Sequence, residues 1–459
     1  MVRRGTVALL GVLALAAILR LWGLEQPLWP DEALYLQTAR NLYLGRGLTF
    51  DGTPWQETQP PLFIFSLAIS NLLLGPSEPA ARVVGPLFGV LGVLAVYQLG
   101  RALYGERVGL LAALLLAVNP AHWFFSRMAL ADVPLATLLT LSAYLLYTGH
   151  EKGDGRTLAL AGVAMGLACL TKRIGLLVYP ITLLYLTGRS RMAWTRDRAV
   201  LGMLALSMAL QLPWFIRNYA LFGDPLVSAG SYIAGIFGSR GPESLNPLRI
   251  PAVLPFPILL AALWGALPKG RAMRRRDLPL LHISVFLLVL ALWYRLEVSR
   301  YLIPIVPFFS LLAALGVLEA THPLAGGKAR VLISTFLIAV LATSLLEGAA
   351  VLERNGHKYE GYKATAAWIS ENAPADALVI SNARAIFYYS ARNTTYFPPS
   401  EEALWELVKG RDAYLVTGDW PVHMGYPRYI GNLSGIMLEA TFNEPPMPQI
   451  KVYKAVWHE

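Results

Sequence analysis

The sequence predicts an α-helical protein that crosses a membrane many times and ends in a small α/β domain. The chain has 459 residues, of which 55% are apolar and only 15% charged, and its mean hydropathy is +0.48. That composition is too apolar for a soluble protein of this size. Apolar runs of about 17 to 25 residues recur as far as about residue 347, and each is long enough to span a bilayer as a helix. Beyond residue 350 the pattern changes to alternating helices and strands.

The first span is expected at residues 6–24, after the basic pair Arg3 and Arg4. The segment LRLWGLEQPLW contains no small-residue cleavage site, so we expect the first span to stay as a helix and not to be removed as a signal peptide. The same apolar pattern continues along the chain and gives about 11 spans in all. The later spans are expected at 81–100, 108–125, 133–149, 157–171, 174–187, 199–216, 251–267, 278–294, 301–319 and 330–347.

The stretch 61–75, PLFIFSLAISNLLLG, is apolar but short, which favours an interfacial or re-entrant helix over a span. Counting it as a span would place the two most basic loops, GRSRMAWTRDR and KGRAMRRRD, outside, against the positive-inside rule. The N-terminus is therefore expected in the cytoplasm. The segments then expected on the outer face are residues 25–80, the turn around Asp132, the loop 217–250 and the chain after 348. The chain is thus expected to consist of a membrane module (1–348) and an extracytoplasmic domain (349–459).

The net charge is +10, but the basic residues form short clusters between apolar spans, as cytoplasmic loops do, and no nucleic-acid partner is expected. The single cysteine, Cys169, lies in an apolar run. It therefore allows no intramolecular disulfide and no cysteine-based metal cluster, and we expect it to be a core residue.

The tail is expected to form mixed helices and strands. GYKATAAWISENAPADALVISNARAIFYYS is typical of an amphipathic helix, a turn, a buried strand and another helix, while DAYLVTGD and IKVYKAVW indicate further strands. Asn393-Thr394-Thr395 and Asn432-Leu433-Ser434 fit the glycosylation sequon, which is usable only on the outer side and often arises by chance.

Two adjacent carboxylates, Asp31 and Glu32, open the segment PDEALYLQTARNLYLGRG directly after the first span. Its apolar stripe and its closing glycines predict a helix that lies flat on the membrane surface. Asp31 lies near the N-cap of this helix, and capping alone would explain it, although no Glu follows three positions later to complete a capping box. A catalytic carboxylate is the alternative.

The second outward turn, NPAHWFFSRMALADVPL, places Arg127 and Asp132 between two spans. A charge at membrane depth costs about 2.5 to 3.5 kcal/mol, so such residues tend to serve function or to pair with each other. An isolated Arg127–Asp132 ion pair and a plain N-cap at Asp132 are the structural alternatives.

Further cations are expected at the outer ends of other spans. LTKRIGLLVYP places Lys172 and Arg173 there, and EVSRYLIPIVPFF places Arg300 there. Each could simply extend to lipid headgroups. Together they put cationic groups on the face that also carries carboxylates, which is the arrangement expected of a site that holds an anionic phosphate beside a carboxylate base.

These motifs, with QPPLFIFSLAI, SRMALADVPL, LPWFIRNYALFGDPL and RYLIPIVPF, resemble the GT-C superfamily of integral-membrane glycosyltransferases over about residues 1 to 320. The resemblance is to the branch of dolichyl-phosphate-mannose protein mannosyltransferases and lipid A aminoarabinose transferases. It implies transfer of a sugar from a polyprenyl-phosphate carrier to a glycan, lipid or protein acceptor on the outer face, usually with inversion. The large carbohydrate-binding insert of the eukaryotic enzymes is lacking, and we expect the plasma membrane of a prokaryote.

The resemblance maps the family's acidic pair onto Asp31 and Glu32, and its Ser-Arg…Asp segment onto Ser126, Arg127 and Asp132. Where mannosyltransferases often have His-Pro-Pro, this chain has Gln59-Pro60-Pro61.

The chemistry of transfer gives the residues roles. The acceptor hydroxyl needs a general base, for which we choose Asp31, with Glu32 and Asp132 orienting the acceptor or the base. The cationic residues suit the donor phosphate: Arg127, Lys172, Arg173 and Arg300. The substrate pocket is expected to include Tyr35, Gln59, His122 and Tyr301. No Gly-rich phosphate loop calls for a nucleotide. Some relatives use a divalent cation, so Mg²⁺ or Mn²⁺ bridging Asp31 and Asp132 is an alternative to a site without metal.

Two other functions compete with an enzyme. A transporter or flippase of lipid-linked sugars would more often show two related halves and helices broken near mid-membrane. A non-enzymatic assembly subunit would bind through the domain at 350–459. The gathering of charges at one face favours the enzyme.

The topology predicts which residues can be labelled from outside. In a Cys169→Ala background, Asp51→Cys and Ser400→Cys should react with an impermeant maleimide in intact cells, whereas Arg274→Cys should not. Labelling at position 274 alone would show that the topology is inverted.

Overall fold

The computed structural model describes residues 4–52, 59–227, 253–267, 273–293, 299–324, 326–355, 359–418, 429, 433–444 and 447–455. The chain forms two compact units, which we call the helical unit and the mixed unit. The helical unit is Met1–Leu24, Thr58–Ser66 and Arg82–Leu352, and the mixed unit is Glu25–Glu57, Leu67–Ala81 and Glu353–Glu459. The first loop and the tail, which the sequence assigned to separate domains, thus belong to one unit. Most of the loop 217–250 and the sequon residue Asn432 lie outside the described residues.

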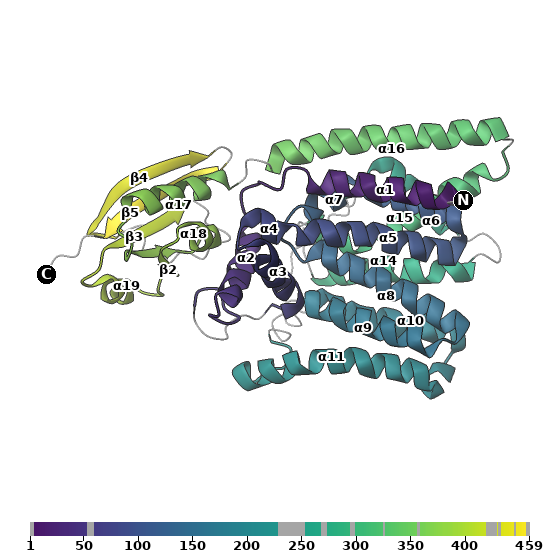
Figure 1. Ribbon diagram of the computed structural model, residues 1–459, viewed down its shortest axis with the longest axis horizontal. Coiled ribbons are helices and arrows are strands. Elements are labelled where there is room, and N and C mark those ends of the chain that lie inside the picture. Colours follow the sequence, from purple (N-terminus) through teal and green to yellow (C-terminus); the bar gives the residue numbers. More distant parts are fainter. Residues whose placement is uncertain are drawn as a thin grey trace. The chain divides into compact units, whose positions relative to one another are not determined.

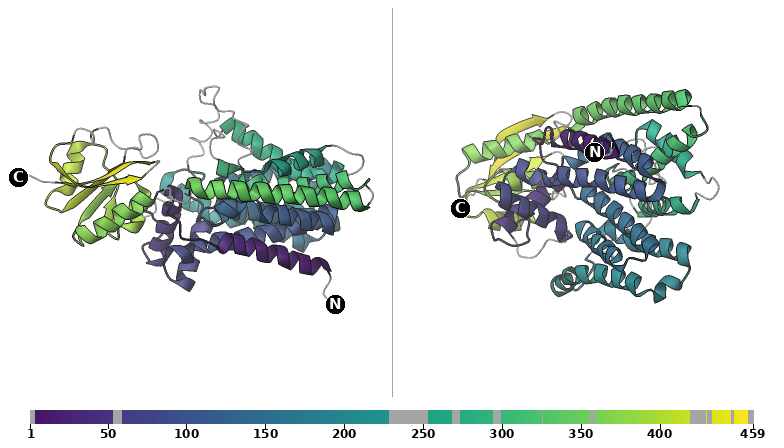
Figure 2. Two further views of the ribbon diagram at one scale, coloured as in Figure 1. Left: turned by 90° about the horizontal axis from the view of Figure 1, so that it is seen from above. Right: turned by 45° about the vertical axis from the view of Figure 1, so that its right-hand side comes forward.

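The helical unit is a bundle whose long helices run side by side (Figure 1), and the two further views show the same alignment for α1 and α16 (Figure 2). Its elements are α1 (Arg4–Leu21), α5 (Val84–Tyr104), α6 (Glu106–Ala117), α7 (Pro120–Ser126), α8 (Asp132–Lys152), α9 (Gly155–Thr171), η1 (Arg173–Leu177), α10 (Val178–Ser190), η2 (Ala193–Arg196), α11 (Arg198–Phe222), α13 (Phe256–Ala266), α14 (Met273–Trp293), η6 (Ser299–Ile305), α15 (Val306–Thr321) and α16 (Gly326–Asn355). Helices α3 (Pro61–Leu74) and α4 (Glu78–Arg82) are shared between the two units.

The apolar helices confirm the predicted class of membrane protein. Five described helices are long and apolar enough to cross a membrane, or six if the bent pair α6 and α7 forms one span. Helices α1 and α16 leave most of their apolar surface exposed, as helices in contact with lipid do. The expected count of about 11 spans stays a prediction, since several of the predicted segments form shorter helices, such as α9 and α13. The short stretch at 61–75 forms the 14-residue helix α3.

The segment 108–125, expected as one helical span, is broken in the structure, because α6 ends at Ala117 and α7 begins at Pro120, at an angle of 64° to it. Proline has no N–H for a helical hydrogen bond and disfavours helical geometry in the residue before it. Asn119 is accordingly extended, and its side-chain carbonyl accepts a hydrogen bond of 2.8 Å from the His122 backbone N–H. The asparagine therefore caps a new helix at the break.

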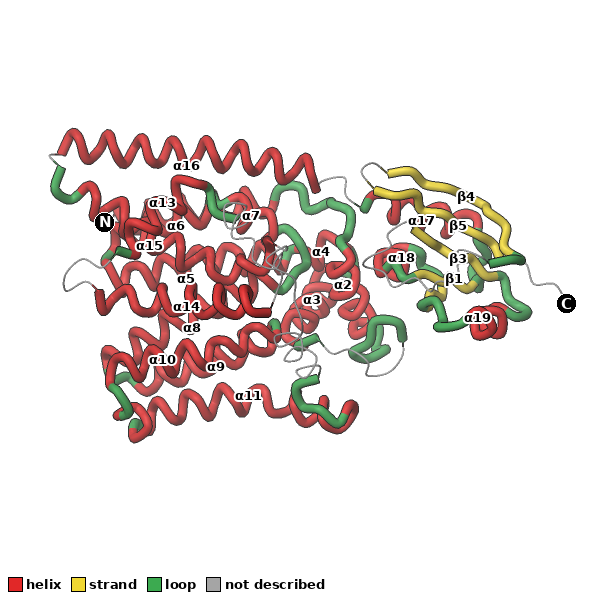
Figure 3. The backbone as a smooth tube through the Cα atoms, turned by 180° about the vertical axis from the view of Figure 1, so that it is seen from behind, coloured by secondary structure: helices red, strands yellow, loops and turns green. Residues whose placement is uncertain are grey.

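The mixed unit contains all the described strands (Figure 3), which form one sheet in the order β2-β1-β3-β5-β4. Strand β1 (Leu378–Ser381) is parallel to β2 (Asn393–Thr395) and to β3 (Ala413–Gly418). Strand β5 (Met447–Ala455) is antiparallel to β3 and to β4 (Ile436–Glu444). The sheet confirms the predicted α/β domain. Two parallel strands need a crossover connection, usually a helix, which explains why helices lie between β1 and its parallel neighbours along the chain.

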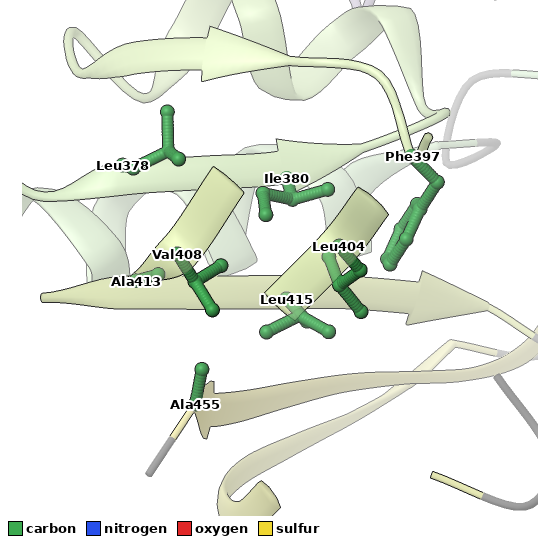
Figure 4. Packing of buried hydrophobic residues seen from close by; sticks show 8 residues of the cluster. All are labelled: Leu378, Ile380, Phe397, Leu404, Val408, Ala413, Leu415 and Ala455. Atoms are coloured by element: carbon green, nitrogen blue, oxygen red, sulfur yellow. The ribbon is translucent and has the colours of Figure 1, made fainter. Parts of the chain in front are cut away.

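Helices cover both faces of the sheet. Helix α19 (Glu401–Val408) packs Leu404 and Val408 over Leu378, Ile380 and Leu415 (Figure 4). Because side chains alternate between faces along a strand, the neighbours of these sheet residues point to the opposite face. There α17 (Glu360–Asn372) and α18 (Arg384–Tyr389) pack on the sheet, which explains why all four residues of β1 are buried. Helix α2 (Pro30–Tyr43), from the first loop, packs on α18 within this unit.

Candidate functional site

The helical unit brings together four of the predicted site residues, Asp132, Lys172, Arg300 and Tyr301, which we call the Asp132 cluster. Asp132 is the first residue of α8, is only 2% exposed and lies 2.5 Å from the Lys172 ammonium through its Oδ1 atom. Lys172 ends α9 in an extended conformation, so that its side chain leaves the helix at the turn into η1. The buried carboxylate therefore has a cationic partner from a neighbouring helix.

Tyr301 joins the other members of the cluster. The Lys172 ammonium lies 4.8 Å from the centre of the Tyr301 ring, and the Arg300 guanidinium carbon lies 5.3 Å from the same centre. Aromatic rings attract cations at such distances. Two positive charges from distant parts of the sequence thus meet at one ring, beside one negative charge.

Arg127 is placed differently from the expected Arg127–Asp132 ion pair. Its guanidinium donates a hydrogen bond to the Gly23 carbonyl and lies 5.5 Å from the Trp123 ring. Arg82 donates to the next carbonyl, that of Leu24, at 2.6 Å. Two nearly buried arginines thus hold the chain where it leaves α1. The partner of Asp132 in the described structure is Lys172, so this alternative from the sequence is wrong.

His122 lies inside the bundle and is fully buried. Its Nδ1 atom accepts a hydrogen bond of 2.9 Å from Arg20, which also donates to the Leu116 and Ala117 carbonyls at 3.2 and 3.0 Å. The Ala117 carbonyl is the last of α6, where helical donors run out, whereas the Leu116 carbonyl also accepts a hydrogen bond of 3.4 Å from the Asn119 backbone N–H. The sequence analysis did not single out Arg20, although an arginine within an apolar span is a signal of a polar role.

In the mixed unit, Asp31 forms an ion pair with Arg384 of α18, with 3.0 Å between its Oδ1 atom and Nη1. The two side chains are 35% and 37% exposed. The pair holds the carboxylate in one orientation while leaving it accessible. The partner of Asp31 could not be expected from the sequence, because no local pattern links Arg384 to a carboxylate in the first loop.

Glu32, and not Asp31, is the carboxylate seen to cap α2. Trp29 is the N-cap residue, and its backbone N–H donates a hydrogen bond of 3.1 Å to Glu32 Oε2. This is the half of a capping box in which the third helical residue reaches back to the cap. Glu32 is completely buried, and Tyr35, one turn beyond Asp31, is nearly so.

The remaining predicted residues lie beside these groups along the chain. Gln59 is half-buried just before α3, and Arg173 is the first residue of η1, next to Lys172. Among the described residues no group of three or more His, Cys, Asp and Glu side chains is arranged to hold a metal ion. The catalytic and binding roles of the individual residues stay predictions.

Comparison with known proteins identifies the fold. Residues 58–216 match the family model of dolichyl-phosphate-mannose-protein mannosyltransferases. ArnT from Cupriavidus metallidurans bound to undecaprenyl phosphate superposes with a TM-score of 0.71 at 15% identity, covering 97% of each chain. The chain has the fold of the GT-C glycosyltransferases. The resemblance seen in the sequence is thereby confirmed.

Two other proteins are similar to this chain. The archaeal oligosaccharyltransferase AglB from Archaeoglobus fulgidus, in complex with an inhibitory peptide and a dolichol-phosphate, has a TM-score of 0.65 at 14% identity, covering 91% of this chain and 69% of that one. The same protein has been solved in complex with Zn and sulfate. An uncharacterized protein from Aquifex aeolicus is 26% identical over 296 residues, which span 62% of this chain and 58% of that protein.

Arg20 should be required for the stability of the helical unit. Arg20→Met keeps a long apolar stem but removes the donor to the Ala117 carbonyl and to His122, and each buried unsatisfied group costs about 1 to 3 kcal/mol. We therefore expect a loss of about 3 kcal/mol or more, measured as a lower Tm of the purified protein in detergent. Arg101→Met, at an exposed arginine of α5, is the control. Equal Tm values for the two variants would contradict the role of Arg20.

Proposed function

We propose that the chain is an integral-membrane glycosyltransferase that moves a sugar from a polyprenyl-phosphate carrier to an acceptor on the outer face of the membrane. The fold supports this activity, because ArnT was solved with undecaprenyl phosphate and AglB with a dolichol-phosphate. The observation that carries the proposal is the Asp132 cluster, where two cations meet at one aromatic ring beside a buried carboxylate.

The Asp132 cluster suits the leaving group. When the bond between the sugar and its carrier breaks, the electron pair stays on the lipid phosphate, and fixed cations stabilise the charge that develops. Arg300 offers two parallel N–H groups to phosphate oxygens, while Lys172 offers a compact charge. Asp132 contributes by holding the Lys172 ammonium in place.

Asp31 suits the acceptor. The acceptor hydroxyl must lose its proton as its oxygen bonds to the anomeric carbon, and a positioned carboxylate can take that proton. Arg384 orients the Asp31 carboxylate, and Glu32 fixes the start of the helix that carries it. Attack from the side opposite the departing phosphate inverts the anomeric centre.

A divalent cation that bridged Asp31 and Asp132, the alternative offered by the sequence, would have to displace a cationic side chain from each carboxylate. Each carboxylate already binds a cationic side chain, Arg384 in the mixed unit and Lys172 in the helical unit. An oligosaccharyltransferase from Archaeoglobus fulgidus has been solved with Zn and sulfate.

Asp31→Asn tests the proposed base. The amide keeps the shape of the side chain but accepts no proton, so turnover should fall by roughly 10² to 10⁴-fold while donor binding is largely kept. The measurement is mass analysis of product formed by the purified protein from a panel of polyprenyl-phosphate sugars and acceptors. A flippase would form no product with the parent chain. Asp412→Asn, at a carboxylate of the mixed unit paired with Lys454, is the control, and near-normal turnover of Asp31→Asn would refute the assignment.

Lys172 and Arg300 should act on the donor phosphate. Contacts to a charged group contribute about 1.5 to 3 kcal/mol each, so Lys172→Ala and Arg300→Lys should each reduce donor use by roughly 10 to 150-fold, for donors of any lipid length. The measurement is kcat/KM for the donor. Arg189→Lys, at an arginine paired with Glu151, is the matched control. Donor kinetics like those of the parent in both variants would exclude these residues from the phosphate site.

A further inference from the structure

A cavity of about 530 Å³ lies within the mixed unit, apart from Asp31 and its partner. Its wall consists of the second half of α2, the chain that follows this helix as far as Gly52, and the turn between α18 and β2. Its volume is within the range of about 300 to 1,000 Å³ that small-molecule sites occupy. Neither the Asp132 cluster nor the proposed base uses it.

Two amide carbonyls in the wall have no hydrogen-bond donor among the residues that the structure describes. Asn41 is 2% exposed, and its Nδ2 donates hydrogen bonds to the Thr49 and Phe50 carbonyls at 3.0 and 2.9 Å. These two acceptors fix the orientation of the amide, and its Oδ1 atom is buried without a hydrogen-bond partner among the described residues. The same holds for Oε1 of Gln37, one helical turn earlier in the same wall. Buried acceptors of this kind are normally satisfied, so a donor from outside the described residues, such as a ligand hydroxyl, would complete both amides.

The wall also carries a positive charge, with three arginines, Arg40, Arg46 and Arg392, against one aspartate, Asp51. Two of the arginines are held by the protein itself. Arg40 donates to the Tyr388 carbonyl at 3.3 Å, and Arg392 donates to the Ser370 and Ala373 carbonyls at 2.7 and 3.0 Å. A fixed guanidinium loses little freedom when it binds an anionic oxygen.

We infer that this cavity is a binding site for an anionic saccharide. Cationic donors attract a carboxylate or phosphate group, whereas the two carbonyls of Gln37 and Asn41 suit separate hydroxyl donors, and the phosphate dianion HPO4²⁻ carries a single hydroxyl. A sugar that carries an anionic substituent satisfies both sets of groups. Resting on the proposed function, the bound saccharide is a unit of the acceptor other than the one whose hydroxyl reacts at Asp31.

Binding of defined probes tests this inference without any donor. The full-length protein in nanodiscs would be titrated with glucose 1-phosphate, glucuronic acid, glucose and inorganic phosphate, followed by saturation-transfer NMR. The two anionic sugars should bind at least tenfold more tightly than glucose or phosphate. Arg46→Gln, at an exposed arginine, and Gln37→Leu should each weaken their binding by about tenfold. Arg411→Gln, at an exposed arginine outside the cavity wall, is the control and should leave binding unchanged.

Three results would overturn the inference: no saturable binding of either anionic sugar, phosphate binding as tight as that of glucose 1-phosphate, or unchanged binding in Arg46→Gln. This binding test does not depend on sugar transfer. If the protein binds the probes but forms no transfer product, the inferred binding site stands and the proposed function is refuted. Conversely, the protein could transfer sugar with the same KM for the acceptor in Arg46→Gln as in the parent. The proposed function would then stand, and the inferred binding site would be refuted.

Discussion

The helical unit depends on the contact between the buried guanidinium of Arg20 and the open end of α6. A proline breaks the span, and a break inside an apolar bundle exposes carbonyls that lipid cannot satisfy. Arg20 supplies the missing donors, so the chain can turn into α7. That turn delivers Arg127 to the carbonyl of Gly23, just after the helix that carries Arg20. Because α8 begins directly afterwards, the position of Asp132 follows from the same break.

The two predicted carboxylates are both held by cations, but in different environments. Asp132 is buried in the helical unit against Lys172, whereas Asp31 is partly exposed in the mixed unit against Arg384. A buried ion pair is rigid and costly to break. A carboxylate in an accessible ion pair can instead separate from its cationic partner and accept a hydrogen bond from a substrate hydroxyl. Under the proposed function, this difference matches the two tasks, since charge stabilisation needs a fixed cation and proton removal needs an accessible base.

The sequence predicted what depends on local pattern. Apolar periodicity located the helices of the bundle and the strands β1, β3 and β5, and unusual charges in apolar surroundings located Asp132, Lys172 and Arg300. The sequence did not predict the contacts between segments that lie far apart along the chain. Arg384 lies 353 residues from its partner Asp31, and no spacing rule could connect the two. The break at Asn119-Pro120 had a local signal in that dipeptide, which the apolar run around it concealed.

The uncharged stretch of helix α16 is shorter than the hydrocarbon core of a typical bilayer. Residues 331–346 carry no charge and extend about 24 Å at 1.5 Å per residue, against about 30 Å for the hydrocarbon core of a typical bilayer. The helix is mostly exposed, so few protein contacts oppose the lipid in setting its depth. Hydrophobic mismatch should therefore act on this helix directly, and a thinner bilayer would accommodate it with less deformation. The thickness of the membrane should therefore influence the depth of α16, the helix that leads into the tail.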